Sequence, residues 1–130
     1  SAIQESVKGT FLDRTITCRD FNNNMVTMSY SEMIIEAAKR NNISAFYIKS
    51  KIIQEVGVHG SGSVTGTYPG YEGYYNFYNY GAYDDGDDIA NGLSYAKNKR
   101  WDSQYKAIVG GAELIGTYYI NSRTKYSIFQ

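Results

Sequence analysis

The residue best suited to chemistry is Glu55, in the stretch "SKIIQEVG". It follows apolar residues spaced as on one face of a helix, and Gly57, a common helix-ending residue, stands two positions later. A carboxyl group that packs against apolar side chains, or lies at the negative end of a helix dipole, favours its protonated form. Such a group can protonate the leaving oxygen of a glycosidic bond. The pattern alone also fits an exposed helix-end glutamate without chemistry.

An unusual density of tyrosine follows this glutamate. Seven of the fourteen tyrosines of the chain fall within residues 68–83. Sugar rings have apolar C–H faces that pack on aromatic rings, and phenol hydroxyls can pair with sugar hydroxyls. We expect Tyr78 and Tyr80 to contact a substrate. Asn76 and Asn79 could bind a substrate amide, but we favour the interpretation that they brace the backbone of the loop.

Two helices are expected to position these groups. The first covers 29–43, because Ser29 and Glu32 have the spacing of a capping box and apolar residues then repeat on one face. The second covers 45–57, with Ser44 as its cap. The carboxylate described above then lies in the last turn of this helix, beside its apolar stripe.

Helical spacing disappears over 57–83, where glycine is frequent, so we expect a long loop or a small irregular sheet. A short helix should follow the acidic turn 84–88, whose aspartates can cap it. The last clear helix is expected over 104–120, with Asp102 or Ser103 as its cap. These patterns predict an α+β protein that is mainly helical.

The composition bounds the class of protein. A length of 130 residues predicts one domain, 1–130, in which 1–28 form an irregular N-terminal arm with room for one short helix. Thirteen basic and thirteen acidic residues give zero net charge, which argues against a nucleic-acid or anionic-membrane partner. No apolar run is long enough to span a bilayer. With Cys18 and His59 each alone of their type, we expect neither a disulfide nor a metal site, and no other cofactor.

Three blocks of the sequence, taken in their order along the chain, carry a family resemblance: "SKIIQEVG", "YYNFYNYGA" and "NGLSYAKNKRWDSQYKAIVGGAELIGTYYI". Over roughly residues 30–125 they make the chain similar to the glucosaminidase-type autolysin catalytic domains of glycoside hydrolase family 73, above all to clostridial members. The resemblance implies a lysozyme-like α+β fold with a small irregular β-lobe. It also implies an endo-β-N-acetylglucosaminidase that cuts the bond from N-acetylglucosamine to N-acetylmuramic acid in peptidoglycan, with Glu55 as the acid.

The second catalytic group stays open at this point. Members of the family often place another carboxylate in the β-lobe, which suggests Glu72 or the aspartates of the acidic turn. The alternative needs one carboxylate only, because the 2-acetamido group of the substrate can attack its own anomeric carbon. The resemblance points to Tyr105 as a residue that positions this acetamido group or a water molecule. Trp101 could stack on a sugar, although a core position is favoured.

Two other readings compete with the glucosaminidase. A muramidase or lytic transglycosylase could use the same scaffold and a single glutamate, and a catalytically inactive wall-binding module could use the tyrosine-rich groove. In each case the partner is a peptidoglycan glycan strand. We expect a secreted, cell-wall-associated protein that acts as a monomer.

Overall fold

The computed structural model describes residues 1–83 and 86–115. Within these ranges the chain is mainly helical, with one antiparallel pair of strands. The α+β class predicted from the sequence is therefore confirmed. In chain order the elements are α1 (Ala2–Ser6), β1 (Thr15–Arg19), β2 (Met25–Ser29), α2 (Tyr30–Asn41), α3 (Ala45–Val56), the 3₁₀ turn η1 (Gly62–Val64), α4 (Asp88–Lys99) and the π-helical segment η2 (Lys106–Gly110).

The ends of the two central helices follow the capping signals of the sequence. The Ser29 hydroxyl accepts a hydrogen bond from the amide of Glu32 at 3.0 Å, and the Glu32 carboxylate reaches back to the amide of Ser29. This reciprocal pair satisfies two amides that the first turn of α2 would leave unpaired. At the start of α3, the Ser44 hydroxyl accepts from the amide of Tyr47. Both predicted helices are confirmed.

The strands lie in the N-terminal segment that the sequence analysis expected to be irregular. In the hairpin of β1 and β2, Thr15 pairs with Ser29 and Arg19 with Met25. By contrast, residues 57–83 form a loop with one 3₁₀ turn and no strand. The loop alternative is thus the one observed. The sequence did not predict the hairpin, because buried and exposed residues hardly alternate along its strands. Cys18 is the single buried residue of the two strands.

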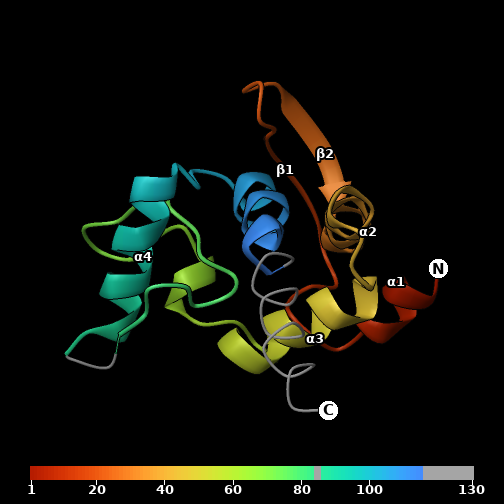
Figure 1. The fold of residues 1–130 in the computed structure, drawn as a ribbon, viewed down its shortest axis with the longest axis horizontal. Helices are drawn as coiled ribbons and strands as arrows, with labels where there is room; N and C mark the ends of the chain where they lie inside the picture. The colour runs from red at the N-terminus through yellow and green to blue at the C-terminus, as the bar shows by residue number, and fades with distance from the viewer. Residues whose placement is uncertain (84–85, 116–130) are drawn as a thin grey trace, which may run out of the picture.

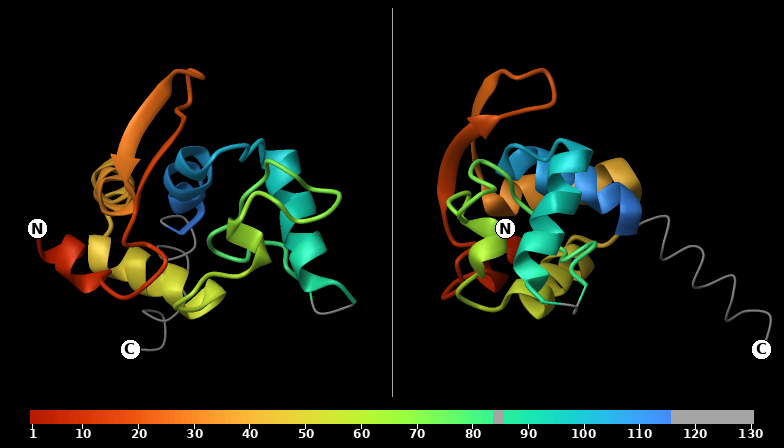
Figure 2. Two further views of the ribbon diagram at one scale, coloured as in Figure 1. Left: turned by 180° about the vertical axis from the view of Figure 1, so that it is seen from behind. Right: turned by 90° about the vertical axis from the view of Figure 1, so that its left-hand side faces the viewer.

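The last helix, formed by residues 104–115 and drawn in blue, lies between two groups of elements (Figure 1). On one side are α1, α2 and the hairpin, and on the other are α4 and the loop that precedes it. The hairpin projects from the body in all three views, while α3 runs below the last helix toward the loop (Figures 1 and 2). The core between these elements is formed by fully buried side chains, among them Met33, Ile34, Ile48, Ile52 and Ile108.

The last helix is helical from 104 to 115, with a π-helical stretch at 106–110. The amide of Lys106 donates to the Ser103 hydroxyl at 3.1 Å, so Ser103 supplies the expected start signal. A Cβ atom at Gly111 would come within 2.5 Å of the Tyr78 ring, so only glycine permits this approach of helix and loop. The expected continuation to 120 lies outside the described residues.

The α4 helix also begins as predicted. The Asp87 carboxylate caps it by accepting from the amide of Ala90 at 3.0 Å, and it accepts a second bond from the Tyr68 hydroxyl at 2.6 Å. That second bond is the main reason why the pKa of Asp87 is lowered. Asp84 and Asp85 of the predicted acidic turn lie outside the described residues. No helix within 1–83 or 86–115 is long and apolar enough to cross a membrane.

Candidate active site

Glu55 lies in the last turn of α3, one residue before the end of the helix. Ile48 and Ile52, on the same side of α3, are fully buried, while 27% of the Glu55 side chain is exposed. The carboxylate is therefore at the margin of the core, where it can be both held by the protein and reached by a ligand. Gly57 ends the helix with φ of 86°, a conformation that glycine adopts without strain.

Two side chains hold Glu55 in place. The Asn79 side-chain amide donates to the backbone oxygen of Glu55 at 2.6 Å and lies 3.4 Å from its carboxylate Oε1. The first contact satisfies a carbonyl that the end of a helix leaves unpaired. On the other side, the Lys51 ammonium lies 3.0 Å from Oε2. The carboxylate is thus fixed from the loop and from its own helix.

Lys51 was missed by the sequence analysis. The signal was present, because Lys51 and Glu55 are four residues apart on a predicted helix and such pairs meet on its surface. The tertiary contact from Asn79 had no comparable signal, since the two residues are 24 positions apart.

The loop that carries Asn79 is organised by Asn76, which is fully buried. Its side-chain amide donates to the carbonyls of Tyr80 and Gly92 at 2.8 and 2.9 Å. Its side-chain oxygen accepts from the amides of Tyr78 and Tyr80 at 3.2 and 3.3 Å. Asn76 therefore braces the loop and joins it to α4. Both asparagines have the bracing contacts that we favoured, although Asn79 also reaches the carboxylate.

Tyr78 occupies a different place from the one expected. Its ring is only 2% exposed and its hydroxyl donates to the carbonyl of Ile108 at 2.6 Å. Instead of forming a groove wall, Tyr78 fastens the loop to the last helix. The physical reason is the close approach allowed by Gly111, which leaves space for a ring in the core.

Tyr80 differs from Tyr78 in the surroundings of its hydroxyl. Its hydroxyl is buried and is the one such side-chain atom, within the described part of the chain, that has no hydrogen-bond partner in the protein. Burial raises its pKa, and the charges of Tyr95, Tyr47 and Glu55 act in the same direction. An unpaired buried hydroxyl costs about 1–3 kcal/mol, so it is a feature that calls for an explanation.

Tyr105 faces another part of the molecule. It is 4% exposed, and its ring packs edge-on against Phe21 with centroids 5.2 Å apart. Burial and the Glu36 carboxylate beside its hydroxyl raise its pKa to about 12. These contacts join Tyr105 to α2 and to the tip of the hairpin, whereas those of Glu55 run to α3 and the loop.

Glu72, the candidate second carboxylate, is exposed. It lies in a turn where the amide of Gly73 donates to the carbonyl of Gly66 at 2.8 Å. The side-chain hydrogen bonds and ion pairs of Glu55 run to Lys51 and Asn79, not to Glu72. Among the described residues, no group of three or more His, Cys, Asp or Glu side chains could hold a metal ion.

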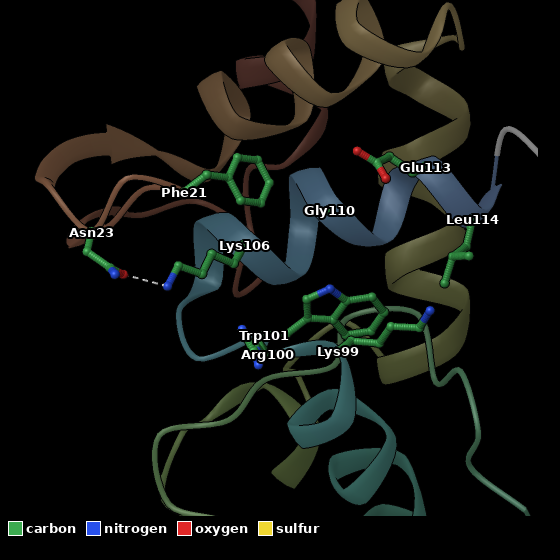
Figure 3. A pocket seen from close by; sticks show the side chains of 9 residues that line it. All are labelled: Phe21, Asn23, Lys99, Arg100, Trp101, Lys106, Gly110, Glu113 and Leu114. Atoms are coloured by element: carbon green, nitrogen blue, oxygen red, sulfur yellow. Dashed lines mark hydrogen bonds between the residues drawn. The ribbon is translucent and has the colours of Figure 1, made fainter.

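The Trp101 ring packs against the Tyr80 ring, with centroids 6.2 Å apart, and Trp101 is 5% exposed. The favoured core position is therefore observed. One edge of Trp101 also lines a cavity of about 430 Å³, together with Phe21, Lys99 and other residues (Figure 3). Glu55 does not line this cavity. The cavity and the carboxylate are therefore separate features.

The fold and the site together define a class: a lysozyme-like α+β protein in which a helix ends at a half-buried glutamate, next to a loop rich in aromatic rings. Comparison with known proteins makes this more specific. The solved structure described as "Major Bifunctional Autolysin" superposes with a TM-score of 0.58 and 35% identity, over 70% of this chain and 37% of that one. Glucosaminidase B of Staphylococcus aureus superposes with a TM-score of 0.56 and 33% identity, over 69% of this chain and 36% of that one.

A shorter similarity is found among curated proteins. The "Bifunctional autolysin" of S. aureus strain Mu50 is 47% identical over 38 residues, which is 29% of this chain and 3% of that protein, and strain N315 gives the same values. The chain thus spans a small part of these relatives. No protein-family profile matches it. The resemblance to glucosaminidase-type autolysins and the lysozyme-like fold that it implied are confirmed.

Proposed function

We propose that the protein is an endo-β-N-acetylglucosaminidase that hydrolyses the N-acetylglucosamine-β-1,4-N-acetylmuramic acid bond of peptidoglycan, with Glu55 as general acid. The observation that carries the proposal is the carboxylate at the end of α3, partly exposed and held by Asn79, in a fold shared with autolysin glucosaminidases. Such a protein acts on the bacterial cell wall, so we also propose a secreted, wall-associated monomer that needs no cofactor.

Glu55 has to hold a proton when it acts as an acid. In the substrate-free protein its Oε2 accepts instead from the Lys51 ammonium. We therefore propose that a bound sugar displaces Lys51, whose long side chain is 31% exposed and can turn into solvent. Asn79 stays in place during this exchange because its main bond is to the backbone of Glu55, so that the carboxyl keeps its orientation toward the glycosidic oxygen.

Tyr80 supplies a substrate contact in this scheme. Its hydroxyl is buried without a protein partner, and it binds a polar group of the sugar when the substrate displaces the side chains around it. The substrate acetamido group is our choice for the second catalytic group, because Glu72 is exposed in a turn of the loop. For Tyr105, the catalytic role stays a prediction that its contacts with Phe21 do not support.

A muramidase or lytic transglycosylase remains the second candidate, since it could use the same carboxylate. Mass spectrometry of digested peptidoglycan separates the two. Fragments with N-acetylglucosamine at the reducing end support the proposal, whereas reducing or anhydro N-acetylmuramic acid supports the alternative. Glu55→Gln keeps the shape of the side chain, and we expect it to lower the turnover at least about 100-fold while the protein stays folded. Unchanged turnover in this variant, or wall binding without any release of fragments, would overturn the proposal.

A further inference from the structure

The cavity beside Trp101 is lined by groups that suit an anion with an apolar body (Figure 3). Phe21 comes from the tip of the hairpin and Trp101 from the segment after α4, and Gly110 of η2 lies between their rings. A Cβ atom at Gly110 would lie 3.2 Å from Nε1 of Trp101 and 3.5 Å from Cε1 of Phe21. A side chain at this position would therefore occupy the space between the two rings, which glycine leaves open.

The charges around the cavity are mostly positive. Lys99, Arg100 and Lys106 line it, together with one carboxylate, Glu113. The charge of Lys106 is already matched, because its ammonium lies 2.6 Å from the Asp102 carboxylate and 2.7 Å from the Asn23 side-chain oxygen.

Lys99 and Arg100 are the other two cations that line the cavity. Among the described residues, neither Lys99 nor Arg100 forms a salt bridge with a carboxylate. The Lys99 ammonium instead lies over the Tyr95 ring, 5.7 Å from its centroid. Both residues are exposed, so both can take an anionic partner from solution.

The cavity is separate from Glu55, but Trp101 lies between the cavity and the loop that holds Glu55. The Trp101 ring that lines the cavity packs against the Tyr80 ring, with centroids 6.2 Å apart, and Tyr80 directly follows Asn79, whose side chain holds Glu55. A substrate with an anionic branch could therefore place its glycan at Glu55 and its branch in the cavity.

We propose that this cavity binds the carboxylate-bearing stem peptide of a peptidoglycan strand, with Lys99 and Arg100 as its anion-binding residues and Phe21 and Trp101 as the walls for its aliphatic part. The proposal rests on the proposed function, because a stem peptide is the anionic branch that this substrate offers. It predicts that the enzyme prefers strands with peptides to bare glycan.

A binding experiment tests the cavity without relying on catalysis. Trp101 is the single tryptophan and lines the cavity, so selective tryptophan fluorescence responds to a ligand bound beside it. A short alanine-terminated stem peptide with free carboxylates should change the fluorescence in a saturable way, and the same peptide with amidated carboxylates should not. Lys99→Gln combined with Arg100→Asn should weaken the binding about 10-fold. Asparagine is chosen because Arg100 has φ of 63°, which asparagine tolerates.

The matched control removes the same charge elsewhere. Lys97 lies in the same last turn of α4, and Arg14 is exposed near the hairpin, but neither lines the cavity. Lys97→Gln combined with Arg14→Gln should bind the peptide as the unmodified protein does. Equal weakening in both double variants would show a general charge effect, and no saturable change with the free peptide would show that the cavity does not bind it. Either result overturns the proposal.

Hydrolysis of two substrates separates this proposal from the proposed function. Strands with stem peptides, free of other wall polymers, are compared with the same strands after an amidase has removed the peptides. The cavity variant should raise KM about 5- to 10-fold on the first substrate, with kcat unchanged, and should behave normally on the second. An equal change on both substrates overturns the cavity proposal. Absence of hydrolysis of both by the unmodified protein overturns the proposed function, while the fluorescence result still decides the cavity.

Discussion

The side-chain amide of Asn79 donates a hydrogen bond of 2.6 Å to the backbone oxygen of Glu55 and lies 3.4 Å from its carboxylate. One loop residue thus caps the end of the helix and orients the candidate acid. Because the contact joins α3 to the loop, the geometry of the site depends on how the loop packs.

Replacement of Asn79 by glycine tests this relationship. Asn79 has φ of 56°, so glycine keeps the backbone unstrained and removes only the side chain. We expect kcat to fall about 10- to 100-fold, because a misplaced acid transfers its proton poorly. The control is Asn42→Gly, at an exposed helix end with φ of 53°, which should leave turnover unchanged. Equal activity of the two variants would mean that Asn79 does not position the acid.

The neighbouring tyrosines should respond in opposite ways to loss of their hydroxyl groups. Tyr80→Phe removes an unpaired buried hydroxyl, so we expect the melting temperature to hold or rise while kcat/KM falls. Tyr78→Phe removes the bond to Ile108 and should cost about 1–2 kcal/mol of stability, with turnover per folded molecule retained. Thermal denaturation and steady-state hydrolysis measure both effects. Full activity of Tyr80→Phe would remove Tyr80 from the substrate site.

The buried bracing residue offers a test of stability. Asn76→Ala leaves the carbonyls of Tyr80 and Gly92 and two backbone amides without their partners. We expect a loss of about 3–5 kcal/mol in the free energy of unfolding, measured by denaturant titration. Asn76→Asp should be at least as harmful, because a carboxylate oxygen would then face two carbonyl oxygens. A loss below about 1 kcal/mol in both variants would contradict the bracing role.

Tyr105 can be tested by substitution and by pH. If Tyr105 positions substrate, Tyr105→Phe should reduce turnover far more than thermal stability. A sharp fall in melting temperature with normal turnover per folded molecule would show that its role is structural.

The alkaline stability of the same variant gives a second measurement. The pKa of Tyr105 is raised from 10.0 to about 12 by burial and by Glu36. As the pH rises, the unfolded chain therefore loses the Tyr105 proton before the folded protein does. The contribution of this protonated hydroxyl to the free energy of unfolding is complete below pH 10 and is lost as the pH rises toward 12. The phenylalanine variant has no such proton, and its melting temperature should fall less over this range. Parallel curves for the two proteins would contradict the shift.

The stereochemistry of the product decides the role of Glu72. If the substrate acetamido group makes the attack, the fresh product is the retained β-anomer and Glu72→Gln keeps most of its turnover. If Glu72 activates water, the carboxylates work about 6.5–9.5 Å apart and the α-anomer forms first. Proton NMR of the product during the first turnovers distinguishes the two. An initial α-anomer would refute the acetamido mechanism.

The sequence by itself determined the features that depend on local interactions. Interactions between neighbours within four residues set the helix caps at Ser29 and Ser44. They also set the position of Glu55 in the last turn of α3, and the structure has all three as predicted. The hairpin was not predicted, because its pairing joins residues up to 14 positions apart, such as Thr15 and Ser29, with little alternation in burial.

Only the tertiary structure decided which rings face the core. Tyr78 and Tyr80 look equivalent in the sequence. In the structure, Tyr78 packs into the core over Gly111, whereas the Tyr80 hydroxyl is buried without a partner in the protein. The contact from Asn79 to Glu55 and the meeting of Phe21 with Trp101 around Gly110 likewise join distant segments. Such contacts depend on how closely two backbones approach, a quantity that spacing along one chain does not contain.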